Sequence, residues 1–134
     1  MIHSSYFNYS LKYRLLLVIF KDYQRNSVRT IYLIIMKKLR DILLSEYREN
    51  IIKIAYKHGA YNVRIFGSVA RGEEKENSDI DFLIDYDLNR ITPWFPVGLI
   101  NDLESYLGKK VDVVTEKSLH YFLRDKILKE AVLL

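Results

Sequence analysis

Apolar residues recur at helical spacing in three parts of the chain. Between residues 37 and 58 they return every three or four positions, and Gly59 ends the run. Residues 99–107 and 118–132 repeat this spacing, with Gly108 after the first and Ser118 as the expected N-cap of the second. The pattern predicts three helices. The apolar stripe of the last one is expected in the core and comprises Leu119, Phe122, Leu123, Ile127, Leu128 and Ala131.

Short β-rich runs separate these helices. Residues 63–66, 79–86 and 109–115 predict strands, and Pro93-Trp94-Phe95-Pro96 predicts a loop over 89–98. Successive side chains of a strand alternate between its two faces. The core face of the second strand is therefore expected to hold Ile80, Phe82, Ile84 and Tyr86. Its opposite face holds Asp79, Asp81, Leu83 and Asp85.

Asp79 and Asp81 thus converge at the start of one strand. At about 4 Å and an effective dielectric near 20, two carboxylates repel by roughly 4 kcal/mol, and a divalent cation removes this penalty. Oxygen-only ligands favour Mg²⁺ or Mn²⁺ over zinc. Magnesium sites usually combine one or two carboxylates with substrate phosphates.

A Gly-Ser turn precedes the two aspartates. Gly67 permits close approach of the backbone, and the Ser68 hydroxyl can hold phosphate oxygens together with exposed N–H groups. A lone Gly-Ser is usually a turn, and a lone Asp-x-Asp is often a solvated strand edge. Their ordered combination is far more specific, and it predicts a metal-dependent phosphoryl-transfer site.

Two further charged residues are candidates for the same site. If the 109–115 strand lies beside the 79–86 strand, at about 4.8 Å, Asp112 completes a three-carboxylate site for two metal ions. Asp112 faces away from Val111 and Val113 in that strand. Arg71 is a candidate for the charge of a triphosphate, although an arginine just after a turn is more often solvated.

These residues resemble the minimal nucleotidyltransferases of the DNA polymerase β-like superfamily. That family carries Gly-Ser, ten residues and then Asp-x-Asp, and Gly67-Ser68 and Asp79-Ile80-Asp81 follow this pattern without departure. The similarity runs from about Met36 to the C-terminus and is greatest to antitoxin members that pair with HEPN-domain ribonuclease toxins. It implies an α/β (α+β) fold in which helices flank a small mixed sheet.

The resemblance also implies a function and a set of roles. An antitoxin of a type VII (HEPN/MNT) system transfers AMP from ATP to a tyrosine of its HEPN toxin by two-metal catalysis, and is expected to form an oligomer with it. Asp79 and Asp81 would bind both Mg²⁺ ions, Asp112 the catalytic one, and Ser68 the triphosphate. A shared fold does not identify the acceptor. Two alternatives stay open: a nucleotidyltransferase for a small molecule such as an aminoglycoside, and an inactive module that neutralises its partner by contact.

Composition and charge restrict the function classes. The 134 residues suffice for one domain with a core, and the absence of cysteine excludes disulfides, thiolate zinc sites and thiol catalysis, which suits a cytoplasmic protein. The histidines at positions 3, 58 and 120 show no metal-binding spacing and are expected at the surface or at helix ends. Residues 1–35 hold five of the 21 basic and one of the 17 acidic residues, which leaves 16 of each from Met36 onward. Direct nucleic-acid binding is not expected, because such a surface normally gives a lopsided charge balance.

Residues 1–35 stand apart from the rest of the sequence. Their apolar runs, 15–20 and 31–36, are much shorter than the roughly 20 residues that span a bilayer. No small-residue cleavage pattern of a secretory signal follows the first run. Because Met36-Lys37-Lys38-Leu39 looks like a second translation start, we expect an extension over 1–35 and the nucleotidyltransferase domain over 36–134. The alternative is an amphipathic helix that docks on the domain or on a partner.

Overall fold

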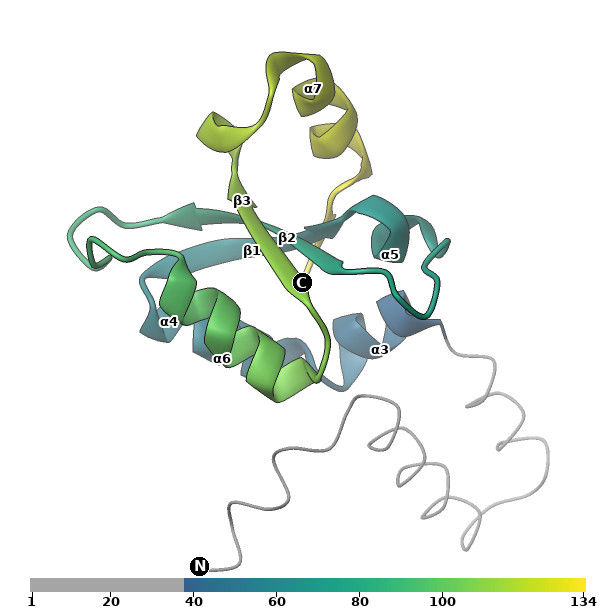
Figure 1. Cartoon of the computed structure of the whole chain (residues 1–134), viewed down its shortest axis with the longest axis horizontal. Coiled ribbons are helices and arrows are strands. Elements are labelled where there is room, and N and C mark those ends of the chain that lie inside the picture. The colour runs from purple at the N-terminus through teal and green to yellow at the C-terminus, as the bar shows by residue number, and fades with distance from the viewer. Residues whose placement is uncertain (1–37) are drawn as a thin grey trace, which may run out of the picture.

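A four-stranded mixed sheet organises the chain. The computed structural model describes residues 38–134, so the expectations for residues 1–35 and His3 lie outside the described residues. The strand order is β3-β2-β1-β4 (Figure 1). β1 pairs antiparallel with β2 and β4, whereas β2 and β3 are parallel. The strands are β1 (Ala60–Phe66), β2 (Ile80–Tyr86), β3 (Val111–Thr115) and β4 (Val132–Leu133).

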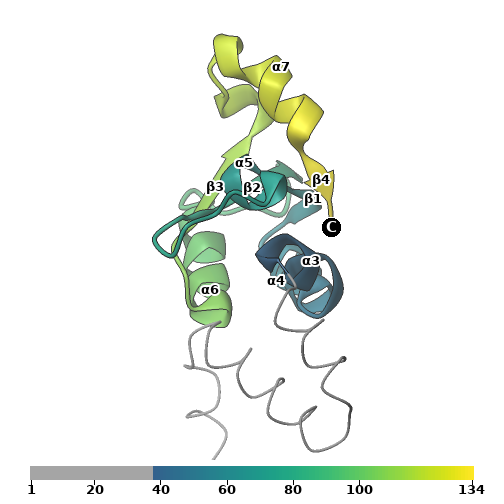
Figure 2. The same ribbon diagram turned by 90° about the vertical axis from the view of Figure 1, so that its right-hand side faces the viewer.

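Helices cover both faces of this sheet. Three of them lie on one face and α7 (Tyr121–Glu130) lies on the other, as the two views in Figures 1 and 2 agree. The short α5 (Gly67–Arg71) follows β1 directly and contacts both layers, through α3 and α7. A 3-10 turn, η1 (Glu116–Ser118), joins β3 to α7. The three helices of the first layer are α3 (Leu39–Ser45), α4 (Arg48–Lys57) and α6 (Val97–Leu107).

Two apolar clusters hold the layers together. The larger cluster lies between the sheet and α3, α4 and α6, and it includes the fully buried Ile80, Phe82 and Ile84 of β2. The smaller cluster lies between the sheet and α7 and contains Phe66, Leu83 and Ile127. The predicted core face of β2 is therefore confirmed. Its other face is not entirely polar, because α7 covers Leu83.

The helix predicted over 37–58 is two helices. α3 ends at Ser45 and α4 begins at Arg48. Between them Tyr47 is buried and packs on Tyr106 of α6, with 5.4 Å between the ring centroids. The break lets α3 reach α5, where Arg40 Nη1 donates to the Ala70 carbonyl at 3.1 Å. Both helices pack on the same face of the sheet, so the apolar spacing continues through the break and conceals it.

The third predicted helix begins later than expected. Ser118 is not its N-cap, because the Ser118 hydroxyl accepts from Thr115 N–H at 3.0 Å and closes the 3-10 turn. α7 starts at Tyr121, and His120 occupies the capping position, as expected for a histidine at a helix end. His58 likewise caps the end of α4. The predictions for these two histidines are confirmed.

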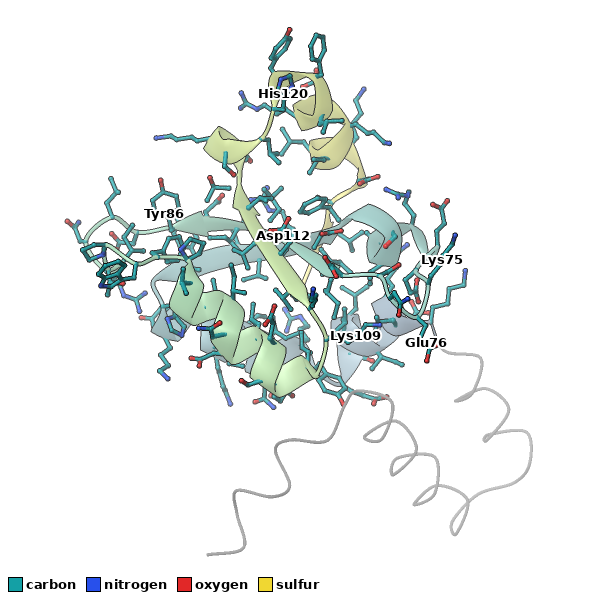
Figure 3. All side chains as sticks on the ribbon, in the orientation of Figure 1. Lys75, Glu76, Tyr86, Lys109, Asp112 and His120 are labelled. Atoms are coloured by element: carbon teal, nitrogen blue, oxygen red, sulfur yellow. The ribbon has the colours of Figure 1, made fainter. Side chains whose placement is uncertain are left out.

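The apolar stripe predicted for this helix is only partly in the core. Ile127 is buried and Leu128 is partly buried against the sheet, but Phe122 and Leu123 are 73% and 52% exposed. Only the second half of α7 packs on the sheet, while its first turn, marked by His120 in Figure 3, projects beyond it. The helix also ends before residue 132, where it was expected to end, because residues 132 and 133 form β4 and pair with Arg64 and Ile65 of β1.

The loop expected over 89–98 and the second helix occur nearly as predicted. α6 begins at Val97 and ends before Gly108, which adopts the left-handed conformation. In the loop, Phe95 packs on Tyr86 with ring centroids 5.4 Å apart, whereas Trp94 is 79% exposed. Every helix within residues 38–134 is too short or too polar to cross a membrane.

Candidate active site

Asp81 and Asp112 lie beside each other near the starts of two neighbouring strands. They are register partners on the parallel strands β2 and β3, whose backbones run about 4.8 Å apart. The flanking residues Ile80, Phe82 and Val113 belong to the larger core, so strand alternation directs both carboxylates to the opposite face. Figure 3 shows Asp112 on this part of β3. The condition set for Asp112, that its strand lie beside that of Asp81, is met.

Asp79 lies just before β2 and is exposed. The strand pairing starts directly after it, where Ile80 N–H donates to the Lys110 carbonyl at 2.9 Å. The turn before it is also fixed by hydrogen bonds, since Ser78 Oγ accepts from Lys75 N–H at 2.8 Å. Asp79 is therefore held at the entrance to the β2–β3 pair, although it is not itself a strand residue as predicted.

Gly67 approaches Asp81 very closely. Its φ of +70° lies in the left-handed region, which favours glycine, and a Cβ added there would collide with Asp81 Oδ2. The preceding residue, Phe66, is the register partner of Asp81 on β2. Ser68 follows in the first turn of α5 and is half-buried. The structure thus brings the Gly-Ser turn against the carboxylates, as the motif spacing indicated.

Arg71 ends α5 and forms two ion pairs. Its Nε donates to Glu73 Oε2 at 2.9 Å, and its Nη1 donates to Glu130 Oε2 at 2.9 Å. The hydrogen bonds with Glu73 and then Glu130 raise the pKa of the guanidinium above its ordinary value. Arg71 is therefore fixed beside the turn, rather than simply solvated.

The fold concentrates negative charge around Asp81. The pKa of Asp81 is raised to about 6, by burial first and then by the charges of Asp112 and Asp79, while the charge of Arg71 acts in the opposite direction. A divalent cation would relieve this repulsion, and the carboxylate oxygens are ligands of the kind that Mg²⁺ prefers. Within residues 38–134, no three acidic, histidine or cysteine side chains by themselves form a metal-binding group. A magnesium ion commonly takes its remaining ligands from water and substrate phosphates.

Glu130 also reaches this site, although the sequence did not indicate it. Its Oε1 accepts from the backbone N–H of Gly67 at 2.9 Å, in addition to its ion pair with Arg71. The two residues are 63 positions apart in the chain. They meet because α7 returns over the sheet and β4 pairs beside β1. No local motif marks such a contact.

A sequence comparison identifies the family of this site. The sequence model of a family described as "Nucleotidyltransferase domain" matches residues 36–134. The chain belongs to this nucleotidyltransferase family. The predicted enzyme class is thereby confirmed.

Curated relatives of this nucleotidyltransferase are named for protein adenylylation. A Methanocaldococcus jannaschii protein named "Putative protein adenylyltransferase" is 46% identical over 89 residues, which cover 66% of this chain and 95% of the relative. "Protein adenylyltransferase MntA" of Thermococcus cleftensis is 32% identical over 97 residues, covering 72% of this chain and 93% of the relative.

Solved structures support the same family and fold. A structure described as a "putative minimal nucleotidyltransferase" is 43% identical, has a TM-score of 0.60, and matches 68% of this chain and 92% of its own. A toxin–antitoxin structure solved with AMP-PNP is 25% identical, has a TM-score of 0.50, and matches 63% of this chain and 69% of its own. The predicted polymerase β-like fold of the minimal nucleotidyltransferases is confirmed.

Proposed function

We propose that this nucleotidyltransferase is a cytoplasmic antitoxin that transfers AMP from ATP to a tyrosine of a HEPN-domain ribonuclease toxin. The observation that carries the transfer chemistry is the meeting of Gly67, Asp81 and Asp112 at one place on the sheet. Nucleotide use is supported by the neighbour solved with AMP-PNP, and a toxin partner by the same toxin–antitoxin structure. The HEPN class and the tyrosine acceptor rest on the family resemblance. We also propose that residues 36–134, which the family match covers, are the working domain and that residues 1–35 are an upstream extension.

The roles of the chain's residues follow from their positions. Asp79, Asp81 and Asp112 would hold two Mg²⁺ ions, with Mn²⁺ as a substitute, and the ions would supply charge neutralisation for the triphosphate and acidify the acceptor hydroxyl. Gly67 would let the turn approach the phosphates closely, and Ser68 would bind their oxygens, with Arg71 beside them. The acceptor oxygen attacks the α-phosphorus, the bond from that phosphorus to the bridging oxygen breaks, and pyrophosphate leaves. Asp112 serves first as a ligand and second as acceptor of the hydroxyl proton.

The test compares the aspartates at the start of β2, Asp79 and Asp81, with Asp85 near its end. Purified chain, ATP, Mg²⁺ and the toxin from the neighbouring reading frame are mixed, and adenylated tyrosine is followed by mass spectrometry. We expect Asp79→Asn and Asp81→Asn to lower the transfer rate by about a hundredfold or more, because they remove groups that organise transition-state charge. Asp85→Asn is the matched control, since Asp85 lies on the same strand face but pairs with Arg64. Transfer at the wild-type rate by the first two variants would refute the assignment.

The two alternatives give different outcomes in the same experiment. A small-molecule enzyme would adenylate an added aminoglycoside and leave the toxin unmodified. A pocket of about 420 Å³ does exist near Tyr86, Glu116 and Arg124, but it lies at the far end of β2 and β3 from Asp81 and Asp112. It therefore gives no support to a small acceptor at the candidate site. An inactive binding module would neutralise the toxin equally well after Asp79→Asn and Asp81→Asn.

A further inference from the structure

Glu130 connects the end of α7 to the Gly67–Arg71 turn by three hydrogen bonds. Its Oε1 accepts from Gly67 N–H at 2.9 Å and from Arg71 Nη1 at 3.1 Å. Its Oε2 accepts from the same Arg71 nitrogen at 2.9 Å. One carboxylate thus holds the backbone at the start of α5 and the side chain at its end.

The Glu130 carboxylate is the more fixed of the two partners of Arg71. The side chain of Glu130 is 16% exposed, whereas that of Glu73 is 66% exposed. Glu73 also lies only two residues from Arg71 and moves with the same turn. Glu130 instead is the last residue of α7, which packs on the sheet, and it lies two residues before β4, which pairs with β1. It can therefore set the position of the turn relative to the sheet.

The position of this turn is critical because Gly67 has almost no free space beside Asp81. A side chain at Gly67 would collide with Asp81 Oδ2, so the backbone there is in close contact with the carboxylate. A small shift of the turn would change the distance between the phosphate-binding groups and the aspartates. Misplacement of about 1 Å can reduce the rate of an enzyme by roughly a hundredfold.

We propose that Glu130 is a positioning residue that holds the Gly67–Arg71 turn against Asp81 in the geometry that receives the triphosphate. The proposal rests on the proposed function for its ligand, ATP, and assigns Glu130 no contact with it. Glu130 acts through Gly67 and Arg71. The acidic charge is tolerated beside the aspartates because the Gly67 N–H and the Arg71 guanidinium both bind it.

The first measurement tests the positioning without any nucleotide. Amide hydrogen exchange of residues 66–72 is followed by NMR in the full chain and in Glu130→Ala, Glu130→Gln and Glu116→Ala. We expect exchange to accelerate about tenfold in Glu130→Ala. Glu130→Gln retains an acceptor oxygen for Gly67 N–H and should stay near the wild-type rate. Glu116→Ala is the control, because Glu116 also pairs with arginines, Arg64 and Arg124, but away from this turn.

The second measurement tests the consequence for the nucleotide. Calorimetric titration with AMP-PNP and Mg²⁺ should show affinity about tenfold weaker in Glu130→Ala, largely restored in Glu130→Gln and unchanged in Glu116→Ala. The losses from Arg71→Ala and Glu130→Ala should not add in the double variant, because the two residues act as one unit. If Glu130→Ala does not fold, Glu130→Asp replaces it in both measurements, because its side chain is one methylene shorter and withdraws the carboxylate from the turn. The same faster exchange and weaker affinity are then expected.

Each outcome decides the proposal. Faster exchange together with weaker nucleotide binding supports it. Faster exchange with unchanged affinity for AMP-PNP would mean that Glu130 stabilises the turn without affecting nucleotide binding. Unchanged exchange would mean that Glu130 does not hold the turn. Either result overturns the proposal. Absence of AMP-PNP binding by the wild-type chain would refute the proposed function, while the exchange rates would still decide whether Glu130 fixes the turn.

Discussion

Asp81 is the residue whose protonation the fold changes most clearly. Its pKa rises to about 6 because of burial first and the charges of Asp112 and Asp79 second. The folded chain therefore binds a proton at Asp81 more tightly than the unfolded chain does. Its contribution to stability is present at low pH and is lost as the pH rises through about 6. Without a cation, the charged Asp81 opposes folding at neutral pH.

Replacing Asp81 by asparagine should therefore stabilise the metal-free protein at pH 8. We expect a gain of about 1 kcal/mol in the free energy of unfolding, a value reduced for the solvent screening of a half-exposed carboxylate. The gain should shrink as the pH falls from 6 to 4. Urea unfolding in the presence of EDTA, at a series of pH values, measures it. Loss of stability at pH 8 would show that the raised pKa is wrong.

Asp102 provides a control of opposite sign. Its pKa is lowered by the hydrogen bond with His58 at 2.6 Å, and also by Lys57. Its contribution to stability is present above the unfolded pKa and is lost as the pH falls through the folded one. Asp102→Asn should therefore destabilise the protein at pH 8, in contrast to Asp81→Asn.

The sequence indicated those candidate site residues whose relationship is local. Gly67, Ser68, Asp79 and Asp81 stand at a recognisable spacing, and their residue types indicate phosphate and metal chemistry. Glu130 could not be found in this way, because its partners lie far away in the chain and an isolated glutamate near a helix end is usually a solvated residue. Asp112 is intermediate. Strand alternation predicted which face of its strand Asp112 occupies, but its position beside Asp81 follows only from the register between β2 and β3.

At the scale of elements, the sequence pattern did not predict β4, although β4 forms one edge of the sheet. Two residues of β4 pair with β1, and Leu134 N–H then donates to the Val63 carbonyl at 2.9 Å. Leu134 is 5% exposed and belongs to the larger core cluster, while the adjacent Leu133 is 61% exposed. The apolar spacing of residues 118–132 indicated a helix, and it contained no signal of the change to a strand. The burial of Leu134 depends on that change.

Leu134 and Leu133 form a matched pair for testing the importance of β4. Leu134→Ala should lower the free energy of unfolding by about 2 kcal/mol, the lower end of the cost for truncating a buried leucine. Leu133→Ala should change it by less than about 0.5 kcal/mol, because its side chain is exposed. Urea denaturation followed by circular dichroism compares the two variants with the wild type. Equal effects of the two substitutions would contradict the placement of β4.

The break in the first predicted helix has a similar explanation. The periodicity of residues 37–58 correctly marked the buried side, as Ile42, Leu43, Ile51 and Ala55 confirm. It did not mark the turn at Tyr47, because both helices use the same face of the sheet. The spacing of apolar residues in a helix indicates which side of the helix is buried against the sheet. The direction of each helix is decided by contacts such as that of Arg40 with Ala70, which exist only in the folded chain.

At the scale of the whole molecule, the balance of charge is not uniform over the surface. Basic and acidic residues from Met36 onward are equal in number, yet one sheet face brings Asp79, Asp81 and Asp112 together. A triphosphate approaching this face meets repulsion unless a cation is bound with it. Metal and nucleotide should therefore bind cooperatively, each increasing the affinity for the other.

Thermal unfolding of the full chain tests this coupling. AMP-PNP with Mg²⁺ at about 100 times the dissociation constant should stabilise the fold by about 2.7 kcal/mol. For a domain of this size we expect a rise in Tm of roughly 10 °C or more. EDTA should abolish the rise, and Asp112→Asn should reduce it strongly. Asp85→Asn should retain it, because Asp85 binds Arg64 and Asn62 instead. An equal rise in EDTA would mean that the nucleotide binds without a metal at the carboxylates.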